Sequence, residues 1–107
     1  MRTELVRAGK SVSYVILELC SYGETGDFQV LPRSAVSLQL DSILAGVRED
    51  RHQAGIADDV LLARLNGTSV SLYSDGRSVL ERVAPCSGSA AWDVYLYLLG
   101  KEDGREA

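Results

Sequence analysis

The sequence has few of the residue types from which catalytic and metal sites are usually built. It contains one histidine, His52, and two cysteines, Cys20 and Cys86, among 107 residues. A zinc site needs three or four closely spaced Cys, His or carboxylate ligands, and no C-x-x-C pair or phosphate-binding glycine loop occurs. No nucleophile lies near a base in the sequence either. We therefore expect a protein that is not an enzyme and that holds no metal or cofactor.

Long apolar runs and a strong positive charge are also missing. No apolar run approaches the roughly 20 residues that span a bilayer, and the first ten residues lack the apolar segment of a signal peptide. The formal net charge of −4 disfavours electrostatic binding of nucleic acid. We expect a cytoplasmic protein without membrane contact. One domain should cover residues 1–100, with a flexible polar tail over residues 101–107.

The N-terminal part of the chain predicts β-structure. Ser11–Cys20 is rich in β-branched and aromatic residues and is apolar on both faces from Tyr14 to Leu17, which is typical of a strand buried on both sides. Phe28–Leu31 could pair back as a short strand before Pro32, which cannot donate to a ladder. The first ten residues could add an edge strand.

A helix follows, and its start is open to two interpretations. Apolar residues at helical spacing begin after Ser34, which could cap the helix. Alternatively, Ala35–Leu40 alternates like a strand, and Asp41 caps a shorter helix. Both interpretations contain a helix over at least Asp41–Arg48, and Glu49–Asp58 is then expected to be an exposed connection.

The C-terminal half carries the strongest local signals. Asn66-Gly67 and Asp75-Gly76 are turn pairs that favour tight hairpins. After Pro85, serines offer helix caps, and Gly100 stands where a helix commonly ends. Three strands and a helix are predicted: Val60–Leu65, Thr68–Ser74, Arg77–Ala84 and Ala90–Leu99.

The two turns determine which side chains share a face, provided that each loop holds two residues. Glu81 would then fall on the core face, and a three-residue second loop would instead shift the last strand by one position and bury Leu80. The expected core is Val15, Leu17, Leu40, Ile43, Leu44, Val47, Leu61, Val70, Leu72, Val79, Trp92, Tyr95, Leu96 and Leu99. The opposite face is expected to carry Val60, Leu62, Arg64, Tyr73, Leu80 and Arg82.

The stretch SVSLYSDGRSVLERV, followed by AAWDVYLYLLG, resembles the C-terminal hairpin–helix of some E1-like adenylyltransferases that activate sulfur-carrier proteins. In those enzymes the hairpin also turns at Asp-Gly-Arg, and the helix ends in an aromatic–leucine–glycine pattern. The arrangement is similar to half of a TATA-binding-protein type of fold as well. The resemblance covers Val70–Gly100 and implies architecture only, because the nucleotide-binding glycines and catalytic cysteine of those enzymes lie in a large domain with no counterpart here.

Together these observations predict an α+β fold: an antiparallel sheet of four to six strands with two helices packed on one face. A mixture of apolar, tyrosine and arginine side chains on the uncovered face is typical of protein interfaces. We therefore expect an interaction module that forms a homodimer or homo-oligomer, or that binds a protein partner.

Two other functions remain open. Cys86 stands just before a predicted helix, whose N-terminus would favour a reactive thiolate in a thiol- or sulfur-handling protein. Arg64, Tyr73 and Arg82 could bind single-stranded nucleic acid weakly through stacking and charge.

Overall fold

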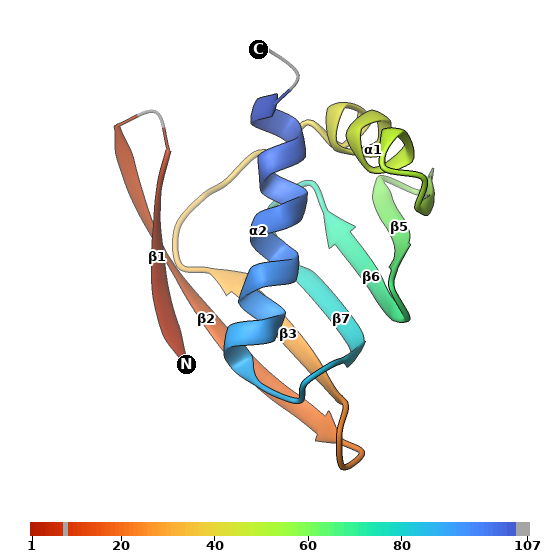
Figure 1. Cartoon of the computed structure of the whole chain (residues 1–107). Helices are drawn as coiled ribbons and strands as arrows, with labels where there is room; N and C mark the ends of the chain where they lie inside the picture. Colours follow the sequence, from red (N-terminus) through yellow and green to blue (C-terminus); the bar gives the residue numbers. More distant parts are fainter. Residues whose placement is uncertain (8, 105–107) are drawn as a thin grey trace.

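A seven-stranded antiparallel sheet organises the chain, in a computed structural model that describes residues 1–7 and 9–104 (Figure 1). In chain order the elements are β1 (Arg2–Arg7), β2 (Lys10–Ser21), β3 (Gly26–Pro32), α1 (Leu40–Glu49), β4 (Gln53–Ala57), β5 (Val60–Leu65), β6 (Thr68–Tyr73), β7 (Ser78–Val83) and α2 (Gly88–Gly104). The predicted α+β class is confirmed, and the sheet has more strands than the expected four to six.

Two local meanders build the sheet. The strand order is β1-β2-β3-β7-β6-β5-β4, so β1–β3 and β4–β7 each pair with sequence neighbours. Only the β3–β7 ladder joins the two halves. The long helix α2 crosses the sheet over β2, β3 and β7, and α1 lies beside it over β4 and β5 (Figure 1).

The expected connection over Glu49–Asp58 is wrong, because its second half forms β4. This strand pairs with β5 through a two-residue turn in which Asp58 and Asp59 have φ values of 50° and 61°. Both values lie in the left-handed region that a type I′ turn requires. Aspartate adopts this region more readily than most residues, but an Asp-Asp pair without glycine is a weak signal in a sequence.

Helix α1 confirms the shorter of the two predicted helices. It begins at Leu40, so neither Ser34 nor Asp41 is its N-cap, and residues 35–39 form neither helix nor strand. The backbone N–H of Gln39, just before the helix, donates to the Glu102 carboxylate of α2. A contact from a distant helix, invisible in the local sequence, takes the role of the missing cap.

The C-terminal helix continues past Gly100 to Gly104, and its last turns are bound by Asp50, the residue directly after α1. Lys101 forms a 2.6 Å ion pair with Asp50, and Tyr97 donates its hydroxyl to the same carboxylate. These two partners hold the pKa of Asp50 below its usual range. Of the predicted polar tail, residues 105–107 lie outside the described part of the chain.

The core lies between the helices and one face of the sheet. Tyr14, Trp92 and Tyr95 pack their rings within 5.1–5.5 Å of one another under α2. Such aromatic groups bury much apolar area and favour tilted or offset geometry. Most of the predicted helix and β5–β6 core residues are buried, and Leu44 and Leu96 are partly buried against the core.

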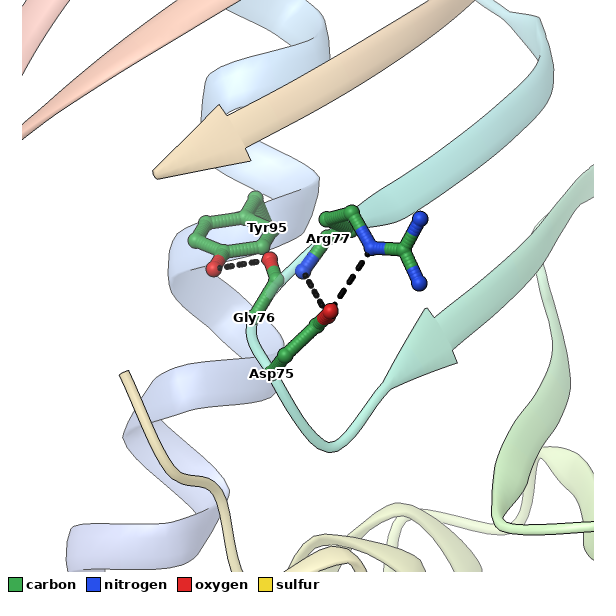
Figure 2. A network of polar contacts seen from close by, with 4 residues as sticks. All are labelled: Asp75, Gly76, Arg77 and Tyr95. Atoms are coloured by element: carbon green, nitrogen blue, oxygen red, sulfur yellow. Dashed lines mark hydrogen bonds and ion pairs between the residues drawn. The ribbon is translucent and has the colours of Figure 1, made fainter. Parts of the chain in front are cut away.

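The turn between β6 and β7 determines which side of β7 is buried. The N–H of Tyr73 donates to the carbonyl of Arg77, so Ser74–Gly76 is a three-residue loop. Gly76 has a φ of 92°, as expected where a type I turn ends in a left-handed residue. Asp75 accepts from the backbone and the side chain of Arg77, and the buried Tyr95 hydroxyl donates to the Gly76 carbonyl at 2.7 Å (Figure 2).

The two-residue loop expected here is therefore wrong, and the three-residue alternative is confirmed. Val70 faces Leu80, and Ser71 faces Val79. Leu80 is fully buried, Ser78 is buried beside it on the core side, and Val79 and Glu81 lie on the opposite side. One extra loop residue has exchanged the faces of β7 from Ser78 to Glu81.

This register buries the Ser78 hydroxyl, which finds no hydrogen-bond partner among the described residues. A buried unsatisfied polar group costs about 1–3 kcal/mol, so Ser78→Ala should raise the free energy of unfolding by about 1 kcal/mol in urea titrations. Ser71→Ala is the matched control on the uncovered face, where we expect a change within about 0.5 kcal/mol. Destabilisation by Ser78→Ala would contradict the assignment.

Candidate interaction face

The face of the sheet opposite the helices is not covered by any other part of the described chain. We call open face seven of the apolar side chains on this side, those of the five inner strands, each exposed or partly exposed: Val15, Leu17, Leu31, Val60, Leu62, Tyr73 and Val79. Of these seven, Leu62 and Leu17 are the most exposed, at 47% and 42%. A contiguous apolar surface of this kind is common at sites of protein interaction.

Cross-strand pairing brings these residues together from both meanders. Val15 faces Leu31 across β2 and β3, and Val60 faces Tyr73 across β5 and β6. Directly opposed residues share a face, and so do alternate residues of one strand. The open face therefore extends over five neighbouring strands, β2, β3, β7, β6 and β5.

Four of the six residues predicted for this face lie on it, and two do not. Val60, Leu62, Arg64 and Tyr73 are placed as predicted, because the two-residue turn at Asn66-Gly67 fixes the β5–β6 register. The prediction for Leu80 is wrong, since the three-residue loop turns its side chain into the core.

Arg82 is exposed, but it lies in a bulge of β7 and not in the predicted row. The β3–β7 register shifts between Phe28 and Gly26, and Arg82 has a φ of 63°. Its N–H donates to the Asp27 carboxylate, which holds the bulge. The row that begins at Arg64 and Ser69 therefore ends at Glu81 and carries charges of both signs.

Sequence reasoning placed three residues of the open face in the core. Val15 and Leu17 were expected there because β2 is apolar on both sides, and Val79 because of the assumed loop length. In fact only one side of β2, with Tyr14 and Ile16, is covered by a helix. Because β2 is apolar on both sides, its second side stays apolar where no helix covers it.

Cys86 does not have the environment of a reactive thiol. Its Sγ atom lies 3.9 Å from a carboxylate oxygen of Glu18, and burial, followed by this negative charge, raises the pKa of the Cys86 thiol. A helix does begin directly after it, with Ser87 as the cap that accepts from the N–H of Ala90. The carboxylate and the burial both oppose the favourable effect of the helix N-terminus.

A raised pKa leaves less thiolate at neutral pH than a free thiol has. In a Cys20→Ser variant, we expect the alkylation of Cys86 by iodoacetamide to need a higher pH than the alkylation of an unstructured cysteine peptide. Adding Glu18→Gln removes the charge and should move the profile to lower pH. Mass spectrometry of the alkylated protein across pH measures both. A midpoint below about pH 8 would instead support a thiol-handling role.

Other kinds of site find no support in the described residues. No group of three or more His, Cys, Asp or Glu side chains is placed to hold a metal ion within residues 1–7 and 9–104. Neither helix, as far as the chain is described, has the length and apolar character of a membrane span. Compared with protein-family models, curated proteins and solved structures, the chain gives no match.

Proposed function

We propose that this chain is a small interaction module, without catalytic activity of its own, whose open face packs against the open face of a second copy. The observation that carries the proposal is the apolar surface of Leu17, Leu31, Leu62 and Val79 on a sheet that is covered on its other side only. Burial stabilises by about 25 cal/mol per Å² of apolar surface. Two such sheets can stack about 10 Å apart, as in β-sandwiches.

The charges around the open face favour a second copy as the occupant. Arg64 and Glu81 flank Ser69 in one cross-strand row. In a two-fold contact both copies use the same patch of surface. Every contact therefore occurs twice, once in each direction between the two copies. Arg64 of each copy can therefore pair with Glu81 of the other, and the contact needs no partner of opposite charge.

The uncovered side of the sheet is comparable in area to a protein interface. Seven strands spaced about 4.8 Å apart form a sheet roughly 30 Å wide, and strands of five or six residues are roughly 20 Å long. A standard interface buries about 800 Å² on each partner. The whole uncovered side, roughly 600 Å² in projection, approaches this value, and the open face lies on five of its seven strands.

The same row weakens the case for nucleic acid on this face. The prediction of such binding placed Arg64 and Arg82 on either side of Ser69, and Glu81 stands where Arg82 was expected. A carboxylate next to the guanidinium repels phosphate. Binding to phosphates would also weaken steeply with salt, whereas apolar association between copies would persist.

Sedimentation velocity over a range of concentrations tests the proposal. Leu62→Glu places a charge in each half of a two-fold contact and should weaken the association roughly 100-fold, since each buried leucine contributes about 1.5–3 kcal/mol. Ser89→Glu is the control: it adds the same charge at an exposed position of α2, on the covered side of the sheet.

Three outcomes contradict the proposal. The first is equal sedimentation of the Leu62→Glu variant and the wild-type chain. The second is an equal loss of association in the Ser89→Glu variant. The third is a wild-type chain that stays monomeric at high micromolar concentration and binds single-stranded oligonucleotide in a salt-dependent way.

A further inference from the structure

The two edges of the sheet differ in how they are protected. Edge strands expose unpaired backbone groups, and natural proteins commonly place charges or proline on them. The edge strand β1 carries the charged residues Arg2 and Glu4, whereas the other edge, β4, reads QAGIA, without charge or proline. The β4 edge is therefore open to pairing with another strand.

The hairpin turn determines which backbone groups of β4 face outward. In a two-residue hairpin the residues flanking the loop, here Ala57 and Val60, exchange hydrogen bonds. Alternation then directs the N–H and C=O groups of Ala54 and Ile56 away from β5. The structure agrees: Nε and Nη2 of Arg48 donate to the Ala54 carbonyl at 3.1 and 2.9 Å.

Gly55, between these two residues, has no role that the single chain explains. A Cβ atom added there would meet no atom within 4 Å, and its φ is not positive. The β4–β5 register runs through it without a bulge. Glycine in the interior of a strand costs stability, and it often marks a place where another backbone approaches closely.

From these observations we propose that β4 pairs antiparallel with β4 of a second copy, on a two-fold axis at Gly55. In this register the N–H of Ala54 in one copy donates to the carbonyl of Ile56 in the other copy. The N–H of that same Ile56 donates back to the carbonyl of Ala54 in the first copy. The two-fold axis repeats both bonds. Arg48 occupies the Ala54 carbonyl in the free chain and leaves it when the strands pair.

A second copy fits this edge better than an unrelated peptide does. The register is symmetric, and it places no like charges opposite each other because β4 has none. Ile56, which is 37% exposed, lies on the helix side and would face Ala54 of the other copy. The pairing covers this isoleucine and satisfies the outward backbone groups at the same time.

This edge contact is independent of the face-to-face contact. Edge pairing leaves both open faces on the same side of an enlarged sheet, so the two contacts use different surfaces. Together, two different two-fold contacts can close into an assembly of four chains. Leu62→Glu weakens the face-to-face contact only. In a protein with this change, the β4 edge contact can therefore be measured alone.

Proline at position 56 tests the edge without breaking the β4–β5 ladder. The N–H of Ile56 points outward, and proline is tolerated where an edge N–H faces solvent. In the Leu62→Glu background we expect a dimer by sedimentation velocity. Adding Ile56→Pro should convert it to a monomer, and Ile56→Val, which keeps the N–H, should leave the dimer.

Arg48→Ala should act in the opposite direction. Removal of the side chain frees the Ala54 carbonyl, and dimerisation in the Leu62→Glu background should tighten roughly tenfold, the effect of about 1.4 kcal/mol. Arg33→Ala removes the same charge at an exposed site on the β3–α1 connection and should change nothing. Circular dichroism shows whether each variant keeps its fold.

The outcomes separate this inference from the proposed function. A Leu62→Glu, Arg48→Ala protein that stays monomeric at high micromolar concentration overturns the edge contact, and so does a folded Ile56→Pro protein that still forms the dimer. If Leu62→Glu leaves the wild-type assembly intact while Ile56→Pro dissociates it, the result supports the edge contact and contradicts the face-to-face contact.

Discussion

Replacing Leu80 with alanine should lower the free energy of unfolding by about 3 kcal/mol, the usual cost of a cavity in place of a buried leucine. Leu80 is fully buried between β3 and β6, where it faces Phe28 and Val70. Its neighbour Val79 points to the open face and is partly exposed. Val79→Ala should therefore cost about 1 kcal/mol or less.

Urea titration of both variants, at concentrations that keep the chain monomeric, measures this difference. The comparison also tests the length of the β6–β7 loop. With a two-residue loop at Asp75-Gly76, Val79 would be the buried residue, and Val79→Ala would cause the larger loss of unfolding free energy. A larger loss for Val79→Ala than for Leu80→Ala would show that the β6–β7 register is wrong.

The second large effect is expected at Gly76, where a side chain meets two obstacles. Its φ of 92° lies in the left-handed region, which costs other residues about 1–2 kcal/mol. A Cβ atom there would also lie 3.2 Å from side-chain atoms of Pro32 and Val36. We expect Gly76→Ala to lower the free energy of unfolding by about 2 kcal/mol or more, because crowding adds to strain.

Gly23→Ala separates the two causes. Gly23 has a similar φ of 82°, but a Cβ atom there would meet nothing within 4 Å. This variant should lose only the conformational part, about 1 kcal/mol. Equal losses for the two glycines, measured in the same urea titrations, would show that Pro32 and Val36 move aside.

Local signals in the sequence were sufficient for most of the elements. Asn66-Gly67 fixed the β5–β6 hairpin to the residue, because a two-residue turn with two left-handed positions leaves one register. The helices followed from apolar spacing, since Ile43 and Val47, like Trp92 and Tyr95, repeat at three or four residues. Patterns of this kind depend on neighbours within a few positions.

The sequence-based prediction is wrong where a distant contact, or a single loop residue, determines the local structure. Asp75-Gly76 fits a loop of two or three residues, and the structure has the longer one, with Tyr95 of α2 bonded to Gly76. The end of α2 depends on Asp50, far away in the sequence. Neither contact can be seen in a local pattern.

The candidate face could be predicted in part for the same reason. Its β5–β6 portion, with Leu62 and Tyr73, followed from the secure turn. Its β2 and β7 portions did not, because an apolar strand such as Ser11–Cys20 does not show which of its sides a helix will cover. The sequence predicts that this strand is buried on both sides, and in the structure a helix covers only one of them.

The β3–β7 ladder has a consequence for the order in which the sheet assembles. Every other strand pair closes a short hairpin, whereas Val30 and Ser78 meet from positions about fifty residues apart. Loop-closure entropy makes such a distant pairing slow relative to hairpins. The two meanders can therefore form early and separately, and until the middle of the sheet closes, β3 and β7 are themselves temporary edges.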